Sequence, residues 1–226
     1  MPPLQINLAT YHSPNFDQRP GKVRALVIHT SEGRWPTDAE WLSSPSSGVS
    51  SHYIIAPDGT IYRLVEDDKR AWHAGVSVFG GLSNWNDFSL GVELSFIRGQ
   101  AFPAVQRTAL HKLSVQLVQK YAIAPGFVVT HRQIAMPRGR RSDPTCLNDQ
   151  DFAAFVASLY SGAGTYRVTF GTAVSEAPRG DAPIALNHTA ALLVGEVVAI
   201  DGVSKDGWGH LANGLGFVCV NTLERI

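Results

Sequence analysis

Two short apolar runs, each with a histidine at its end, place the strongest constraint on the fold of this chain. "KVRALVIHT" (Lys22–Thr30) contains His29, and "FVVTH" (Phe127–His131) ends at His131. Neither run alternates between apolar and polar residues, which is typical of a strand buried on both faces. We therefore expect both runs to lie inside a sheet that is covered on both sides.

The segments around these runs alternate between strand and helix patterns. Two β-rich runs flank Asp58-Gly59, a strong hairpin signal. Thr37 and Glu40 have the spacing of a capping box, which predicts a short helix. A longer amphipathic helix is predicted after Pro103, where apolar residues recur at Val105, Ala109, Leu113, Leu117 and Tyr121. Together these patterns predict an α/β fold with a mixed central sheet flanked by helices.

The predicted strand "SLGVELSF" directs a glutamate away from its apolar face. Leu90, Val92, Leu94 and Phe96 occupy alternate positions and therefore share one face. Glu93 must then point to the opposite face. A solvated charge on an edge strand is the ordinary role of such a glutamate, but these surroundings are too apolar for an edge strand.

A change in sequence pattern at the small-residue segment "SGAGT" (161–165) divides the chain into two predicted domains. Residues 1–161 carry the mixed strands and helices. Residues 165–226 contain short β runs separated by glycine and aspartate turns, without a helical period. This second segment is predicted to be a small all-β barrel.

Composition restricts the partners and the compartment that can be expected. The chain of 226 residues has nineteen basic and nineteen acidic side chains, so we expect no nucleic-acid partner and no attraction to anionic membranes. No apolar run approaches the ~20 residues of a spanning helix, and no signal peptide is visible. Cys146 and Cys219 lie in different predicted domains and are expected to remain thiols. Nothing in the sequence indicates an oligomeric state.

The two strand-end histidines can meet a carboxylate if their strands share one sheet. Asp143 follows His131 closely, and "SDP" restrains its backbone. Two histidines, one carboxylate and an open fourth position form the pattern of a catalytic zinc site. A single buried histidine is more often a hydrogen-bonded core residue, but the pair together with Asp143 favours a metal site.

Five segments, in order, resemble the zinc-dependent N-acetylmuramoyl-L-alanine amidases of the peptidoglycan-recognition-protein-like family. They are "SPNFDQRP", "LVIHT", "SSHYIIAPDGTIYRLVEDDKRAWHAGVS", "NDFSLGVELSF" and "VVTHRQIA…RRSDP". The resemblance spans Ser13–Leu159 and is greatest to the branch with aspartate as third zinc ligand. It implies hydrolysis of the amide bond between N-acetylmuramic acid and L-alanine of the stem peptide, with peptidoglycan or a muropeptide as substrate.

The resemblance also implies roles for individual residues. His29, His131 and Asp143 are expected to bind Zn²⁺, and Glu93 is expected to be the catalytic carboxylate. Cys146 is the alternative third ligand because other branches use cysteine. In those branches proline follows the cysteine, whereas here it follows Asp143.

Several neighbouring residues are expected to bind substrate or to assist catalysis. Arg141 stands where the resembling amidases usually carry lysine, and could stabilise an oxyanion but not donate its proton. Ser51 is a second departure, because cysteine-ligand members often carry a catalytic tyrosine there. His73 is expected to line the substrate groove, and His52 has either a structural role or a substrate contact. Arg140 is either a ligand for a substrate carboxylate or a solvated loop charge.

The C-terminal segment resembles a bacterial SH3-like domain of the kind appended to wall hydrolases, with "DGWGHLANGLGFV" nearest to the usual motif. "VSEAPRGDAP" replaces the customary arginine-containing motif. Made in the cytoplasm, the protein is expected to act on the cell wall after release, as an endolysin does. Two alternatives remain: a recycling enzyme for cytoplasmic muropeptides, and a non-catalytic recognition module, which would have lost the third ligand.

Overall fold

The protein divides into two compact units, Met1–Phe152 and Ala153–Ile226. The structure is a computed structural model that describes residues 4–160 and, beyond them, the strand segments 164–168, 172–173, 191–192, 197–203, 208–211, 217–219 and 223–225. The predicted domain boundary at 161–165 falls mostly outside the described residues and stays a prediction.

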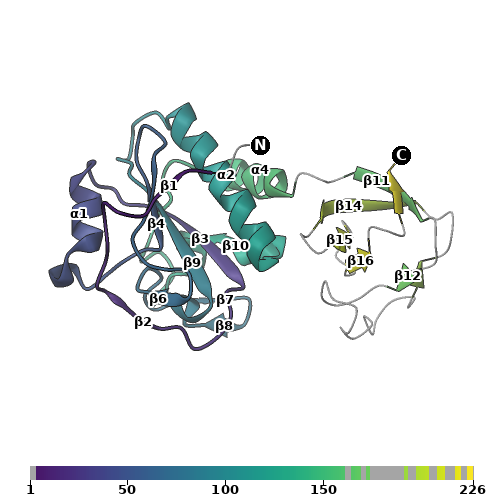
Figure 1. The fold of residues 1–226 in the computed structure, drawn as a ribbon, viewed down its shortest axis with the longest axis horizontal. Helices are drawn as coiled ribbons and strands as arrows, with labels where there is room; N and C mark the ends of the chain where they lie inside the picture. The colour runs from purple at the N-terminus through teal and green to yellow at the C-terminus, as the bar shows by residue number, and fades with distance from the viewer. Residues whose placement is uncertain are drawn as a thin grey trace. The chain divides into compact units, whose positions relative to one another are not determined.

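A six-stranded mixed sheet forms the centre of the first unit (Figure 1). Its order is β1 (Ile6–Asn7), β5 (Ile61–Arg63), β4 (Tyr53–Ile55), β9 (Ser89–Leu94), β3 (Ala25–Thr30) and β10 (Val128–Thr130). Neighbouring strands run parallel, except that β4 and β5 are antiparallel. The predicted mixed central sheet is therefore confirmed.

The described residues also form four helices and three 3₁₀ turns, and the last helix crosses the boundary between the two units. They are α1 (Thr37–Ser43), α2 (Ala104–Tyr121), α3 (His131–Ile134) and α4 (Asp149–Leu159), with η1 (Pro45–Ser47), η2 (Trp85–Asp87) and η3 (Pro125–Phe127). Two small antiparallel ribbons pair β2 (Phe16–Gln18) with β6 (Lys69–Ala71) and β7 (Val78–Phe79) with β8 (Leu82–Ser83). No helix among the described residues is long and apolar enough to cross a membrane.

The hairpin predicted at Asp58-Gly59 joins β4 to β5. Gly59 has φ +86°, a backbone conformation that glycine adopts without a steric penalty. Asp58 accepts a hydrogen bond from the Thr60 N–H at 2.8 Å, as expected for a turn aspartate. The turn chemistry of the sequence therefore predicted this connection correctly.

The predicted helices α1 and α2 are confirmed, but two details of their prediction are wrong. Pro36 takes the N-cap position of α1, so Thr37 is the first helical residue and no side chain caps this helix. In α2, Val105 is 56% exposed, and the buried stripe begins with Gln106 instead. Gln106 can be buried because its amide donates to two backbone carbonyl groups.

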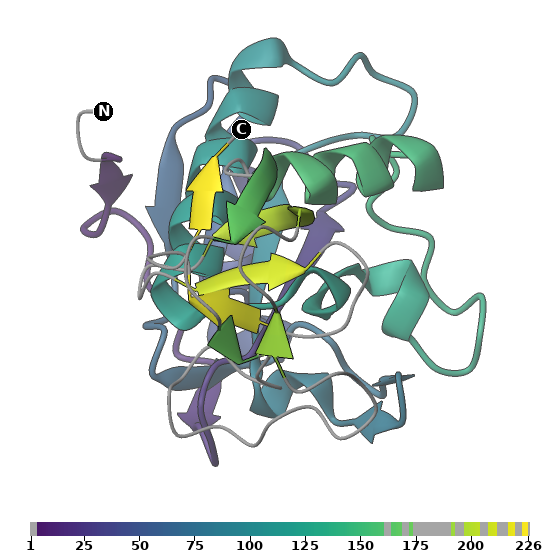
Figure 2. The ribbon, with the colours of Figure 1, turned by 90° about the vertical axis from the view of Figure 1, so that its right-hand side faces the viewer.

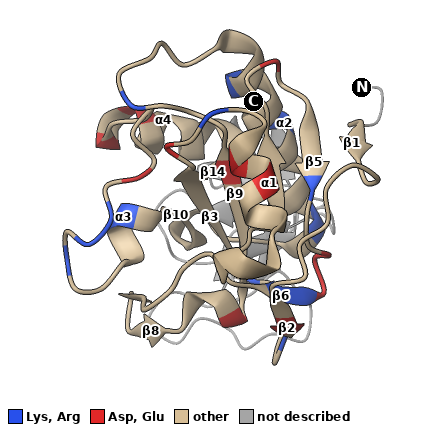
Figure 3. Cartoon of the chain, turned by 90° about the vertical axis from the view of Figure 1, so that its left-hand side faces the viewer, with Lys and Arg blue, Asp and Glu red and all other residues tan. Residues whose placement is uncertain are grey.

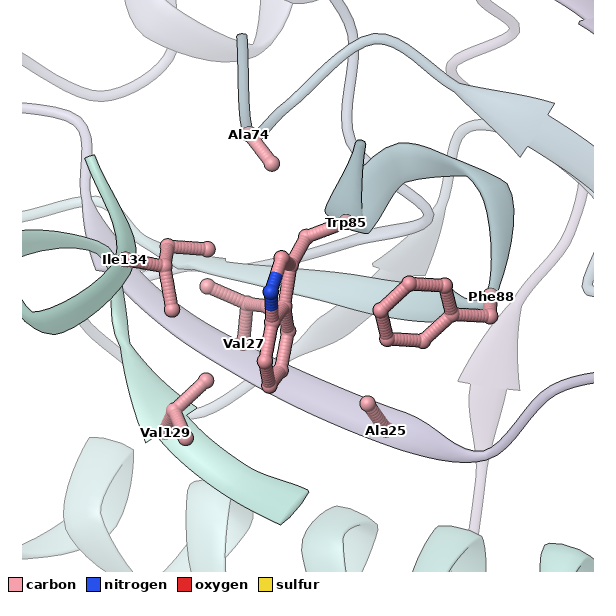
Figure 4. Packing of buried hydrophobic residues seen from close by; sticks show 7 residues of the cluster. All are labelled: Ala25, Val27, Ala74, Trp85, Phe88, Val129 and Ile134. Carbon is pink, nitrogen blue, oxygen red and sulfur yellow. The ribbon is translucent and has the colours of Figure 1, made fainter. Parts of the chain in front are cut away.

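The two faces of the sheet are covered differently. Helix α2 packs against β3 and β4 on one face (Figure 1). On the other face a cluster around Trp85 buries side chains from β3, β10 and three further segments: Ala25, Val27, Ala74, Phe88, Val129 and Ile134 (Figure 4). Because side chains alternate along β3, His29 follows Ala25 and Val27 on the Trp85 face.

The second unit contains a five-stranded antiparallel sheet (Figure 2). Its order is β16 (Phe217–Cys219), β15 (Trp208–Leu211), β14 (Val197–Val203), β11 (Gly164–Val168) and β17 (Leu223–Arg225), and β12 (Thr172–Ala173) pairs with β13 (Ala191–Leu192). Beyond residue 160 the described segments are all strands. The replaced motif "VSEAPRGDAP" lies outside the described residues, and the SH3-like barrel stays a prediction.

Candidate metal centre

The sheet register places the strand-end side chains in one row on the Trp85 face. His29 on β3 lies opposite Glu93 on β9, and Glu93 lies opposite Ile54 on β4. Val129 on β10 lies opposite Val27, so His131, two residues further on, comes level with His29. A run of parallel strands therefore brings the two histidines and the glutamate side by side.

Asp143 reaches between the two histidines. Its Oδ2 lies 3.2 Å from His29 Nδ1 and 3.1 Å from His131 Nδ1. The three candidate ligand atoms lie within 4.8 Å of one another. His29, His131 and Asp143 are buried, with exposed fractions of 1%, 6% and 8%. The structure thus brings together the three residues that the sequence predicted as ligands.

The protonation of this group suits a cation. Burial, and then His131, lower the pKa of His29 to about 4, so its imidazole is neutral near pH 7. Burial opposes ionisation of Asp143, but His131 and His29 outweigh it and lower the pKa of that carboxyl. A neutral imidazole, as in His29, and a carboxylate, as in Asp143, are the forms in which these side chains bind a metal.

The outer nitrogen of His131 supports the same interpretation. His131 Nε2 lies 3.3 Å from the carbonyl oxygen of Ala74, which can only accept a hydrogen bond. If a metal ion replaces the Nδ1 proton, the remaining proton of a neutral His131 belongs on Nε2, where the Ala74 carbonyl accepts it. His131 Nδ1 and Asp143 Oδ2, 3.1 Å apart, are then two acceptors that a cation can bind together. This nitrogen, nitrogen and oxygen set fits the preferences of zinc.

The loop that carries Asp143 is tied to the end of β3. Thr145 N donates to Thr30 Oγ1 at 3.1 Å, and both threonine hydroxyl groups donate to Glu32 Oε1, at 2.8 Å from Thr30 and 2.5 Å from Thr145. Glu32 has φ +55°, an uncommon backbone conformation for a residue other than glycine. The role of Glu32 in holding this loop could not be predicted from the sequence, because no motif marks it.

Glu93 lies next to the three candidate ligands but is not one of them. Its Oε1 lies 4.0 Å from His29 Nδ1, and its Oε2 is buried without a hydrogen-bond partner among the described residues. Burial, and then Asp143, raise the pKa of Glu93 well above its ordinary value. A carboxyl group with a raised pKa beside a candidate metal centre can accept and return a proton.

The loop after α3 carries several basic residues (Figure 3). Arg141 is exposed, two residues before Asp143, and its predicted role stays a prediction. The Arg140 guanidinium donates to the carbonyl oxygens of Met136, Ala74 and Val76, so its hydrogen bonds fasten one loop to another. Its predicted contact with a substrate carboxylate is not tested by these contacts.

His52 and His73 are two further buried histidines, and His73 contacts His29 of the candidate centre. His52 is 0% exposed, and its Nδ1 accepts a hydrogen bond from Gly91 N at 2.9 Å, which fits the structural alternative left open by the sequence. His73 is 8% exposed, and its Nδ1 lies 3.1 Å from His29 Nε2. Its predicted substrate contact stays a prediction, although its ring faces His29 rather than solvent.

Cys146 stands apart from the group of three. It is a free, half-buried thiol, and burial raises the pKa of Cys146 to about 12. A metal binds the thiolate form of cysteine, which so high a pKa disfavours. The structure therefore favours Asp143 over Cys146 as the third ligand.

The mixed α/β sheet and the buried polar cluster at its strand ends are features of a hydrolytic enzyme. The sequence profile described as N-acetylmuramoyl-L-alanine amidase matches residues 19–146, and the chain belongs to this family. The predicted function, cleavage of the amide bond between N-acetylmuramic acid and L-alanine, is the reaction for which the family is named and is confirmed at that level.

Similar proteins include two kinds of bacterial amidase. The 1,6-anhydro-N-acetylmuramyl-L-alanine amidase AmpD of Haemophilus influenzae is 38% identical over 153 residues, which are 58% of this chain and 82% of that protein. The N-acetylmuramoyl-L-alanine amidase AmiD of Escherichia coli is 31% identical over 139 residues, 54% of this chain and 49% of that protein. This chain therefore spans about half of AmiD.

Solved structures of both kinds share the fold. A crystal structure of AmpD has a TM-score of 0.57 at 29% identity and covers 66% of this chain and 93% of that one. AmiD from E. coli, in complex with the substrate anhydro-N-acetylmuramic acid-L-Ala-D-gamma-Glu-L-Lys, has a TM-score of 0.53 at 29% identity, over 65% of this chain and 59% of that one. The predicted α/β architecture is thereby confirmed for the first unit.

Proposed function

We propose that this protein is a zinc-dependent amidase that hydrolyses the bond between N-acetylmuramic acid and L-alanine in peptidoglycan or its fragments. The observation that carries the proposal is the convergence of His29, His131 and Asp143 beside Glu93, whose buried Oε2 has no hydrogen-bond partner among the described residues. Family membership and the substrate-bound structure of AmiD support the same reaction.

His29 and His131 would hold the zinc ion through their Nδ1 atoms, and Asp143 would hold it through a carboxylate oxygen. When bound, zinc supplies a Lewis acid that polarises the scissile carbonyl group and makes water easier to deprotonate. Side chains around the centre carry out the proton transfers and stabilise the developing charge.

Glu93 is the proton carrier of this proposal. As a carboxylate it takes a proton from the attacking water, and as a carboxylic acid it returns that proton to the nitrogen of the departing L-alanine. Burial and Asp143 raise the pKa of Glu93, so its protonated form is stabilised and can serve as the acid of the second step. Arg141, exposed two residues before Asp143, stabilises the negative charge that develops on the substrate oxygen.

Two substrate forms are compatible with this chemistry. The AmpD relatives are named for 1,6-anhydro-N-acetylmuramyl-L-alanine, so a soluble anhydro-muropeptide is the second candidate substrate. The predicted SH3-like second unit favours polymeric cell wall instead. A non-catalytic recognition module is the less favoured alternative, because the third ligand expected to be lost in such modules is present as Asp143.

Metal analysis joined to an activity assay tests the proposal. The purified protein is expected to contain one zinc ion, to lose amide hydrolysis in the presence of a chelator and to regain it when zinc is added. His29→Ala and His131→Ala are expected to lose the stoichiometric zinc. Full activity in metal-free protein would refute the zinc mechanism.

A further inference from the structure

Behind His29, a line of buried polar groups leads away from the metal centre. His29 Nε2 lies 3.1 Å from His73 Nδ1, and His73 Nε2 lies 3.2 Å from Ser89 Oγ. Ser89 Oγ in turn donates to the carbonyl oxygen of Trp85. His29, His73 and Ser89 are 1%, 8% and 0% exposed, so water has little access to this line.

The chemistry of the last group sets the direction of every hydrogen bond. The Trp85 carbonyl can only accept, so it receives the single hydroxyl proton of Ser89. Ser89 Oγ must then accept the Nε2 proton of His73. A neutral His73 has its lone pair on Nδ1, and this lone pair accepts the Nε2 proton of His29.

This direction of the hydrogen bonds determines the state of the opposite nitrogen of His29, Nδ1. With its proton on Nε2, neutral His29 presents the lone pair of Nδ1 to Asp143 Oδ2, 3.2 Å away. We infer that His73, held by Ser89, is a positioning residue that fixes the tautomer of His29 in which Nδ1 can bind the metal. The inference rests on the zinc site of the proposed function.

The surrounding backbone fixes the position of the His73 ring. A Cβ atom at Gly91 would lie 2.6 Å from His73 Cγ, so only glycine leaves room for the ring. On the other side, Asn86 Oδ1 accepts from His73 N at 3.1 Å and from Ala74 N at 2.7 Å. The ring is therefore held both by its own hydrogen bonds and by the packing around it.

A pair of variants with matched shape separates the hydrogen bond from the packing. Asparagine and leucine have the same branched outline, but only asparagine places an acceptor oxygen near the position of His73 Nδ1. We expect His73→Leu to bind zinc about 10–100-fold more weakly than His73→Asn, the range typical for the loss of a partner of a metal-binding histidine. Zinc affinity is measured by competition with a chromophoric chelator, independently of activity.

A spectroscopic measurement on the unmodified protein tests the same inference without a variant. Long-range ¹H–¹⁵N correlations of His29 in the zinc-loaded protein are expected to show a protonated Nε2 and a metal-bound Nδ1. Equal zinc affinities for His73→Leu and His73→Asn would overturn the inference and leave the zinc site intact. A proton on Nδ1 of His29 in the zinc-loaded protein would overturn both the inference and the assignment of Nδ1 as the ligand atom. An unmodified protein that binds no zinc would instead overturn the proposed function.

Discussion

Asp143 lies within 3.2 Å of both imidazole nitrogens of the candidate centre, which makes it the residue whose loss should change the site most. Its loop is held from both sides, since Arg132 N donates to the Asp143 carbonyl oxygen at 2.9 Å and Thr145 N donates to Thr30 Oγ1. These hydrogen bonds hold the Asp143 carboxylate in position, and Cys146 is not a member of the cluster.

Replacement of the two candidate third ligands should give opposite results. Asp143→Ala is expected to weaken zinc binding and remove amide hydrolysis, because two imidazoles alone do not complete the site. Cys146→Ser should leave both properties nearly unchanged, since the thiol is not a member of the cluster. Zinc content and hydrolysis of a muropeptide are measured for both variants. Loss of zinc only in Cys146→Ser would place the protein in the cysteine-ligand branch.

Gly91 offers a test of packing beneath the centre. Gly91→Ala would place Cβ within 2.6 Å of His73 Cγ and 2.9 Å of Ser51 Oγ, so the ring must move. We expect a loss of about 1–3 kcal/mol in the free energy of unfolding, typical of overpacking, and weaker zinc binding. Gly21→Ala is the control, because nothing lies within 4 Å of its added Cβ. Equal urea midpoints for the two variants would contradict the packing account.

Some of these residue roles could be predicted from the sequence, and others could not. His29, His131 and Asp143 were accessible because strand ends and a proline mark them. Glu32 was not, because its hydrogen-bond partners Thr145 and Arg98 lie 113 and 66 residues away in the chain. Contacts of this kind depend on how loops meet in space, which periodicity does not encode.

At the scale of elements, helix α2 shows how a polar residue can join two strands. Gln106 is 0% exposed, and its Nε2 donates to the carbonyl oxygens of Ile55 at 2.8 Å and Ser95 at 2.9 Å. Ile55 is the last residue of β4, and Ser95 directly follows β9, the strand that carries Glu93. Periodicity predicted the helix correctly but assigned its first buried position to Val105, because a glutamine is not counted as a core residue.

The amide of Gln106 should contribute measurably to stability. Gln106→Leu leaves the carbonyl of Ser95 without this donor, whereas the carbonyl of Ile55 still accepts from Ser95 N. We expect a cost of about 1–3 kcal/mol, the usual range for one unsatisfied buried group. Gln116→Leu, at an exposed position of the same helix, is the matched control and should cost far less. Urea unfolding of both variants measures the difference, and equal costs would argue against the bridge.

At the scale of the whole molecule, the family match covers residues 19–146 and therefore addresses only the first unit. The alternation of strands and helices in the sequence predicted the mixed sheet of that unit, because burial on both faces leaves an unmistakable apolar run. The order of the strands could not be predicted, since β9 lies between β3 and β4 through pairings that the chain order does not reveal.

The proposed role of the second unit can be separated from catalysis. A chain that ends at residue 161 is expected to hydrolyse a soluble anhydro-muropeptide as well as the full chain does, because the candidate centre lies entirely in the first unit. On intact sacculi it should be slower if residues 165–226 bind the wall. The release of new L-alanine amino termini measures both reactions. Equal rates on sacculi would remove the wall-binding role and favour the soluble substrate.

The most direct test of the account is the activity of a zinc-loaded Glu93→Gln variant. Glutamine keeps the size of the side chain but cannot accept a proton, and Glu93 is not among the three candidate ligands. We expect unchanged zinc content and a loss of about 10²–10⁴-fold in the rate of amide hydrolysis. The rate is followed by the release of free L-alanine amino termini, with metal content measured on the same preparation. Full activity in zinc-loaded Glu93→Gln would show that another group moves the proton and would contradict the mechanism proposed here.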